Sequence, residues 1–85
     1  MPLGLELMAK AFVFINVQLG SETEVLERLR DVPEVRESYL VYGLYDIVAK
    51  VETDSMDHLK EVITWKVRRV DKVRSTLTTV VMEGE

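Results

Sequence analysis

The sequence predicts a single small α+β domain in which a strand, a helix, two strands, a second helix and a final strand follow one another. Four segments show the period-two alternation of apolar residues that is typical of strands, and two others show the three-and-four spacing of an amphipathic helix. The chain has 85 residues and no linker or low-complexity stretch. We therefore expect residues 1–85 to form one domain.

The first strand is predicted over residues 9–19. Its alternation places small and aliphatic side chains on one face, and Phe12 and Phe14 on the other. Because both faces are apolar near the start of the strand, both need to be covered. The aromatic face is therefore expected to contact a neighbouring element or another subunit.

The first helix is predicted to begin at Ser21, directly after Gly20. Ser21 and Glu24 form the pattern of a capping box, in which each side chain accepts a hydrogen bond from a backbone N–H group of the first turn. Pro33 ends the helix after about three turns, because proline has no amide hydrogen and disfavours helical geometry in the preceding residue. The apolar stripe of this helix consists of Val25, Leu26, Leu29 and Val32.

Two strands, over residues 35–42 and 45–52, are separated by so little chain that they predict an antiparallel hairpin turning at Gly43. The pattern leaves the register of this hairpin open. A second helix is predicted over residues 53–70, with a Thr-Asp-Ser sequence as possible cap and an apolar stripe of Met56, Leu59, Val62, Ile63 and Val67. The last strand is expected over residues 72–82, followed by a disordered acidic tail.

This order of elements folds most simply as two interleaved right-handed βαβ units, which is the ferredoxin-like arrangement. Four antiparallel strands then form one sheet, and both helices cover the same face of it. The other face is too apolar for water and is predicted to pack on a second copy, as in a dimeric α+β barrel. The residues expected on that face are Phe12, Phe14, Leu40, Tyr42, Val48, Thr76 and Thr78.

Composition excludes several classes of function. The chain has 11 Lys and Arg against 15 Asp and Glu, a net charge of -4, which argues against direct binding of nucleic acid. The absence of cysteine removes disulfides, thiolate metal sites and thiol nucleophiles, and fits a reducing cytoplasm. No apolar run approaches the roughly 20 residues that cross a bilayer, and no signal peptide is visible. We expect a cytoplasmic protein without cofactor or metal.

The most informative segment is VYGLYDIVAKV, residues 41–51. It places a glycine turn, two tyrosines and Asp46 at the mouth of the hairpin. Backbone amides at such a turn can hold a carboxylate, and Asp46 can accept hydrogen bonds from an ammonium group, so the turn is suited to a free amino acid. The same residues also fit a plain hairpin in which Asp46 bonds its own turn.

The longer stretch VRESYLVYGLYDIVAKV, residues 35–51, resembles the hairpin of the ligand-sensing domain of Lrp/AsnC, or feast/famine, regulators. The Val-Pro-Glu-Val exit of the first helix and the segment from Val70 to Thr78 fit the same family. The resemblance implies dimers that assemble further, usually as rings of four dimers, with amino-acid effectors held between dimers. It also implies a role in transcriptional regulation or amino-acid metabolism, alone or mixed with full-length relatives. Residues 1–85 are expected to lack the family's DNA-binding helix-turn-helix domain.

The resemblance implies that the effector contacts the hairpin turn at Tyr42, Gly43, Leu44, Tyr45 and Asp46. Weaker candidates on the last strand are Ser75, Thr76 and Thr78. Two departures from the family pattern concern Leu44, where a polar residue is common, and Val70-Asp71-Lys72, where a Pro-Gly pair is frequent. The first departure favours an apolar effector side chain.

Two other functions fit the same fold. A dimeric α+β monooxygenase resembling the haem-degrading type would use an Asn, a Trp and a His, which are available as Asn16, Trp65 and His58. His58 and Trp65 are expected on one short helix and the chain has no convergent set of titratable groups, so no catalytic residue is expected. A ligand-free structural oligomer, in which the turn only joins dimers, is the third hypothesis.

Overall fold

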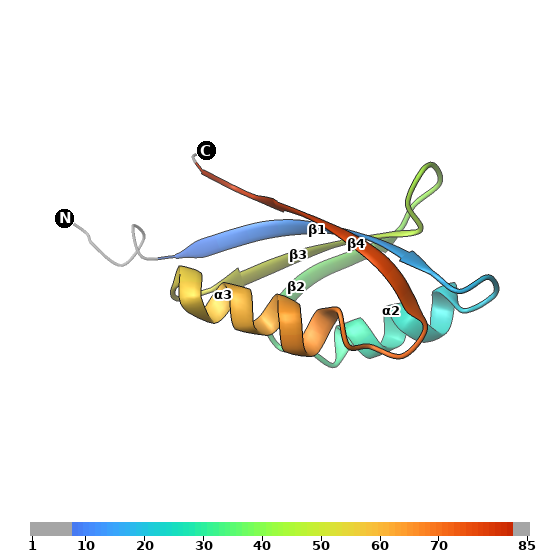
Figure 1. Ribbon diagram of the computed structural model, residues 1–85, viewed down its shortest axis with the longest axis horizontal. Coiled ribbons are helices and arrows are strands. Elements are labelled where there is room, and N and C mark those ends of the chain that lie inside the picture. Colours follow the sequence, from blue (N-terminus) through green and yellow to red (C-terminus); the bar gives the residue numbers. More distant parts are fainter. Residues whose placement is uncertain (1–7, 83–85) are drawn as a thin grey trace.

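The structure is a computed structural model that describes residues 8–82 (Figure 1). The predicted acidic tail lies outside the described residues. The elements of the domain are β1 (Ala9–Val17), α2 (Glu22–Arg30), β2 (Val35–Leu40), β3 (Ile47–Thr53), α3 (Met56–Val62), the π-helical turn η1 (Ile63–Val67) and β4 (Val73–Val80).

The four strands form one sheet in the order β2-β3-β1-β4, and every neighbouring pair is antiparallel. Both helices lie on the same side of this sheet, and the other side is open (Figure 1). The ferredoxin-like α+β fold predicted from the sequence is therefore confirmed. The helices start and end within three residues of the predicted bounds, and the strands within two.

The core lies between the helices and one face of the sheet. Along β1 every second side chain is buried, and the side chains between them are half-buried on the open face. Most of the predicted helix stripes also lie in this core, except that Met56 is 43% exposed. The largest side chains with essentially no exposure are Ile15, Leu29, Ile47, Leu59, Val13, Val25, Val51, Val62 and Val67. No helix within residues 8–82 has both the length and the apolarity to span a membrane.

The two helices begin in different ways. Ser55 caps α3, because its side chain accepts a hydrogen bond from the His58 N–H group at 3.1 Å. Ser21 occupies the cap position of α2, but its side chain makes no capping hydrogen bond, and its backbone is not extended. The carboxylate of Glu24 instead pairs with Lys72 at 3.2 Å. The predicted capping box is therefore wrong, although the predicted start of the helix is right.

The open face of the sheet differs from the predicted one in its outer strands. β2 contains a bulge between Val35 and Glu37, which moves the following side chains to the opposite face. Leu40 therefore pairs with Ile47 on the helix side, while Tyr39 lies opposite Val48 on the open side. Tyr42 lies beyond the end of the strand, in the turn.

The last strand shows the same kind of difference. Thr76 and Thr78 lie opposite Ile15 and Val13, which are core residues, so both threonines belong to the helix side. Leu77 lies opposite Phe14 and takes their place on the open side. Across the sheet, the residues Tyr39, Val48, Phe14 and Leu77 form one continuous row, which we call the apolar row.

Candidate functional site at the hairpin turn

The turn between β2 and β3 is anchored at its base by two backbone hydrogen bonds. The N–H group of Val41 donates to the carbonyl of Asp46, and the N–H group of Asp46 donates to the carbonyl of Ile15, each at 2.9 Å. The turn itself projects from the end of the sheet (Figure 1). Within residues 8–82, the N–H groups of residues 42–45 donate no hydrogen bond. They remain open to water or to a ligand.

The carboxylate of Asp46 has a structural partner in a different strand. Its Oδ2 accepts a hydrogen bond of 2.9 Å from the N–H group of Val17, the last residue of β1. The bond ties the start of β3 to the end of β1, whereas the plain-hairpin interpretation has Asp46 bonding its own turn. Its other oxygen accepts no hydrogen bond from the described part of the chain, and a carboxylate can accept several.

A groove of about 650 Å³ lies beside the turn. Asp46 and Glu22 both line it, so the groove carries two carboxylates and no cation among its lining residues. Such a lining favours a cationic group over an anionic one. The complete lining consists of Glu22, Thr23, Leu40, Val41, Tyr42, Gly43 and Asp46.

The predicted turn residues point in different directions. Tyr42 and Leu44 are almost completely exposed, at 106% and 90%. Tyr45 instead packs on Phe14, with ring centroids 5.6 Å apart, and so belongs to the open face of the sheet. Of the five turn residues predicted to contact an effector, the structure places Tyr42, Gly43 and Asp46 in the groove.

The three weaker candidates on β4 are not together. Ser75 lies on the open face, where the Asn16 side-chain amide donates to its hydroxyl at 3.4 Å. Thr76 and Thr78 lie on the helix side of the same edge strand. None of the three lines the groove beside the turn.

Sequence reasoning missed the contribution of α2 to this site. Glu22 and Thr23 in the first turn of α2 form part of the groove, although no residue of that helix was a candidate. Their acidic and hydroxyl side chains looked like ordinary features of a helix N-terminus. Only the topology, which brings the start of α2 beside the hairpin, could have identified them.

The residues of the monooxygenase hypothesis do not form one site. Asn16 lies on the open face of the sheet, whereas His58 and Trp65 belong to the helix layer. Trp65 is 62% exposed, with the Arg69 guanidinium 5.2 Å from its ring centroid. Within residues 8–82 no group of three His, Asp or Glu side chains is placed to hold a metal ion.

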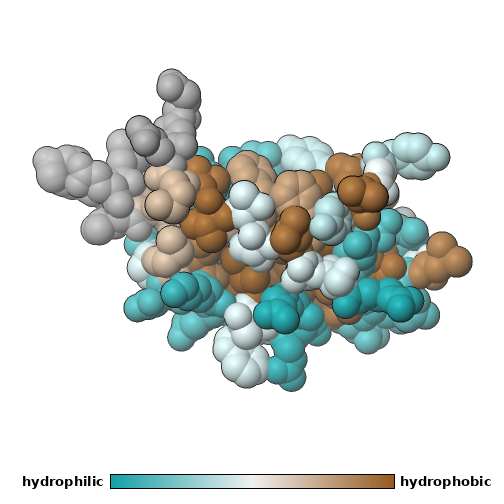
Figure 2. Space-filling view, turned by 45° about the horizontal axis from the view of Figure 1, so that its top comes forward, coloured by the Kyte–Doolittle hydropathy of each residue, from teal (hydrophilic) through white to brown (hydrophobic). Residues whose placement is uncertain are grey.

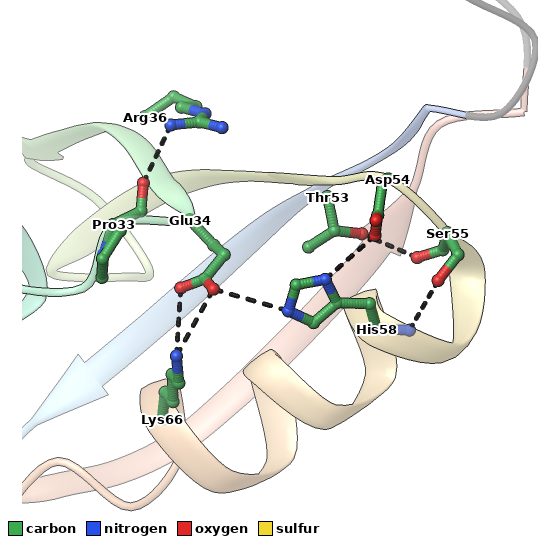
Figure 3. Close-up of polar contacts among 8 residues, drawn as sticks. All are labelled: Pro33, Glu34, Arg36, Thr53, Asp54, Ser55, His58 and Lys66. Carbon is green, nitrogen blue, oxygen red and sulfur yellow. Dashed lines mark hydrogen bonds and ion pairs between the residues drawn. The ribbon is translucent and has the colours of Figure 1, made fainter. Parts of the chain in front are cut away.

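His58 is instead part of an ionic network that connects α3 and η1 to the segment between α2 and β2 (Figure 3). Its Nδ1 lies 3.0 Å from Asp54 and its Nε2 lies 3.4 Å from Glu34, which also pairs with Lys66 at 3.4 Å. The contact with His58 lowers the pKa of Asp54. A backbone hydrogen bond, followed by the bond from Lys66, lowers the pKa of Glu34. These groups have one another as partners.

These features define the class of the chain as a ferredoxin-like α+β domain with an open sheet face and an acidic groove at a hairpin turn. Within that class the family can be stated. The family model of the Lrp/AsnC ligand binding domain matches residues 10–84. The chain belongs to this family, which confirms the resemblance found in its sequence.

Individual relatives agree with this assignment. The chain is 34% identical to the regulatory protein AsnC of Escherichia coli K12, over 84% of the chain and 49% of that protein. It is 33% identical to the HTH-type transcriptional regulator FL11 of Pyrococcus furiosus, over 86% of the chain and 48% of that protein. The chain therefore spans about half the length of these regulators.

FFRP-DM1 is a solved structure that matches the chain over nearly its whole length. It superposes with a TM-score of 0.83 and 40% identity, covering 87% of this chain and 99% of that one. The structure of E. coli AsnC superposes with a TM-score of 0.84 and 30% identity, covering 89% of this chain and 52% of that one.

Proposed function

We propose that the protein is an amino-acid-sensing oligomerisation module that acts in the cytoplasm, in transcriptional regulation or amino-acid metabolism. The named relatives are transcriptional regulators, and the family to which the chain belongs is a family of ligand-binding domains. In this proposal the module is not an enzyme and does not bind DNA directly. It acts alone or by mixing with full-length Lrp/AsnC relatives.

The observation that carries the proposal is the pairing of donors and acceptors at the hairpin turn. The backbone N–H groups of residues 42–45 have no acceptor within the described residues, and they suit a carboxylate. Asp46 and Glu22 in the adjoining groove suit an ammonium group. A free amino acid carries both groups on neighbouring atoms. Such a site recognises the carboxylate and ammonium groups that all free amino acids share more strictly than the side chain.

We further propose that the open sheet face joins two copies into a dimer, and that dimers assemble into a higher oligomer, an octamer in the expected case. The apolar row crosses all four strands of the sheet. Figure 2 shows apolar side chains gathered on the side of the molecule that lies opposite the helices. Among residues 8–82 no helix or strand covers this side of the sheet (Figure 1), and a second copy would remove it from water.

The test is the mass of the native particle, measured by light scattering with and without pooled amino acids at a fixed protein concentration. We expect one pool to change the mass or the melting temperature. The informative variant is Asp46→Asn, because an amide oxygen can still accept the hydrogen bond from Val17 while the charge is lost. It is expected to fold and to lose the response, whereas Asp57→Asn, an exposed carboxylate on α3, is expected to retain it.

The ligand-free structural oligomer is a second hypothesis, because Tyr42 and Leu44 are almost fully exposed at the tip of the turn. It expects Tyr42→Ser and Leu44→Ser to dissociate the higher oligomer into dimers. It also expects no amino acid to change the mass or melting temperature of the wild-type protein. A response to any pool would exclude this hypothesis, and indifference to all twenty amino acids would exclude sensing.

A further inference from the structure

The charges of this acidic protein are strongly segregated. Residues 66–74, which connect the end of η1 to the start of β4, contain five cationic residues and one aspartate, a local charge of +4. The whole chain carries -4. This basic segment therefore differs in sign from the rest of the molecule and is the region most suited to an anion.

Three of the five cations in the basic segment have partners. The pairs are Lys66 with Glu34, Lys72 with Glu24, and Arg69 with the ring of Trp65. Within residues 8–82, Arg68 and Arg74 form no ion pair and no side-chain hydrogen bond. Both arginines line the same hollow, although they come from different elements.

This hollow has a volume of about 320 Å³, and its lining contains no carboxylate. Besides Arg68 and Arg74 the lining consists of Val73, Ser75 and Thr76, and the hydroxyl of Thr76 lies on the same side of the sheet as the helices. A guanidinium group offers a planar fork of N–H donors that matches the two oxygens of a carboxylate or phosphate, and a hydroxyl group adds a further donor. The hairpin groove, lined by two carboxylates, has the opposite chemistry.

A purely structural role explains only one of the two arginines. Arg68 follows the last turn of η1, where a cation interacts favourably with the negative end of the helix dipole. Arg74 lies on an edge strand and has no such reason to be cationic. Its charge beside Arg68 raises the electrostatic energy of the empty hollow, and a bound anion would lower it.

We propose that the hollow formed by Arg68, Arg74, Ser75 and Thr76 binds a small free oxyanion of the carboxylate or phosphate class. The proposal does not depend on amino-acid sensing at the hairpin turn. Because the site is open to solvent and close to a helix C-terminus, the expected dissociation constant is on the order of 1 mM.

The test is thermal unfolding in increasing concentrations of inorganic phosphate, and separately of acetate, with sodium chloride used to keep the ionic strength constant. The binding variant carries Arg68→Gln and Arg74→Gln. The matched control carries Arg28→Gln and Arg30→Gln, which removes two exposed arginines from the last turn of α2. We expect phosphate or acetate to raise the melting temperature of the wild type and the control, with at least tenfold weaker binding in the binding variant.

Equal stabilisation of all three proteins, or no stabilisation of any, would overturn the proposal. The arm that gives the larger shift assigns the site to phosphates or to carboxylates. If the binding variant fails to fold, a backbone amide NMR titration of the wild type with phosphate decides instead. Shifts centred on residues 68 and 74–76 support the site, and shifts elsewhere reject it. Asp46→Asn should retain the phosphate response. Failure of the amino-acid-sensing proposal can therefore be told apart from failure of the anion-site proposal.

Discussion

The two faces of the sheet are built from different kinds of residues. Ile15 and Phe14 are neighbours in β1, yet Ile15 is fully buried against the helices and Phe14 is half-buried on the open side. The covered face is formed by aliphatic side chains together with Ser38 and Thr53, and among residues 8–82 it buries no titratable group. The covered face is therefore shielded by the chain's own helices, whereas the helices leave the open face uncovered (Figure 1).

The open face is itself divided. Beside the apolar row, Lys50 donates a hydrogen bond to Glu37 at 3.0 Å, and the hydroxyl of Tyr39 in the apolar row donates to the same carboxylate at 2.9 Å. Phe12 lies next to Lys50 on this face. Exposed pairs of this kind contribute little stability but orient two surfaces and exclude wrong partners. The covered face thus supplies the core of the fold, and the open face carries the interface of the proposed dimer.

The largest effect is expected on the covered face. Ile15→Ala removes a fully buried side chain from the central strand and leaves a cavity, which should lower the free energy of unfolding by about 2–5 kcal/mol. The loss should be the same at low and high protein concentration, as measured by urea denaturation followed by circular dichroism. A loss below about 1 kcal/mol would contradict the assignment of Ile15 to the core.

On the open face, Phe14→Ala is expected to act through association. It removes the aromatic centre of the apolar row and should weaken dimerisation by about 2 kcal/mol, roughly thirtyfold in the dissociation constant. Sedimentation across a concentration series measures this constant. Gln18→Ala, an exposed residue beyond the end of β1, is the control. An unchanged dimer in the Phe14 variant would exclude the open face as the interface.

A smaller effect is expected at Lys72, where substitution should change the stability of the fold without changing its association. Lys72 has a left-handed backbone with φ of 75°. Lys72→Gly should relieve this strain and raise the free energy of unfolding by about 0.5–1 kcal/mol, even though the exposed pair with Glu24 is lost. Lys72→Ala loses the pair but keeps the strain, so it should not be stabilised. Neither variant should change the dimer dissociation constant.

The smallest effect is an acid sensitivity of the open face. Hydrogen bonds from Lys50 and then from Tyr39 lower the pKa of Glu37 below its ordinary value near 4.5. A lowered pKa means that the pair stabilises the folded protein above pH 4.5 and that this contribution is lost as the pH falls through the folded pKa. Melting temperatures between pH 7 and pH 3 should fall slightly less for Glu37→Gln than for the wild type. Identical pH profiles would show that the pair contributes nothing.

Much of the fold was predictable because its signals are local. The alternation in β1, the stripes of both helices and Ser55 as a cap all depend on residues close in sequence. The faces of the outer strands were not predictable, because one extra residue at Arg36 shifts the alternation of β2. A pattern of period two contains no information about where a bulge occurs.

The candidate site was predictable only in part. The hairpin pattern predicted residues 42–46, and the structure places Tyr42, Gly43 and Asp46 of these in the lining of one groove. The bond from Val17 to Asp46 joins residues 29 positions apart, and no local pattern indicates it. The position of Glu22 in the lining of the groove likewise depends on tertiary structure.

The π-helical turn at Ile63–Val67 has a consequence for how the length of this chain can change. Its closing hydrogen bond runs from the Arg68 N–H group to the Ile63 carbonyl, one residue wider than in an α-helix. Removing one residue from this turn would convert it to ordinary α-helix while Leu59 and Val62 before it keep their packing. The turn is therefore a position where an insertion or deletion can be absorbed during evolution without disturbing the sheet.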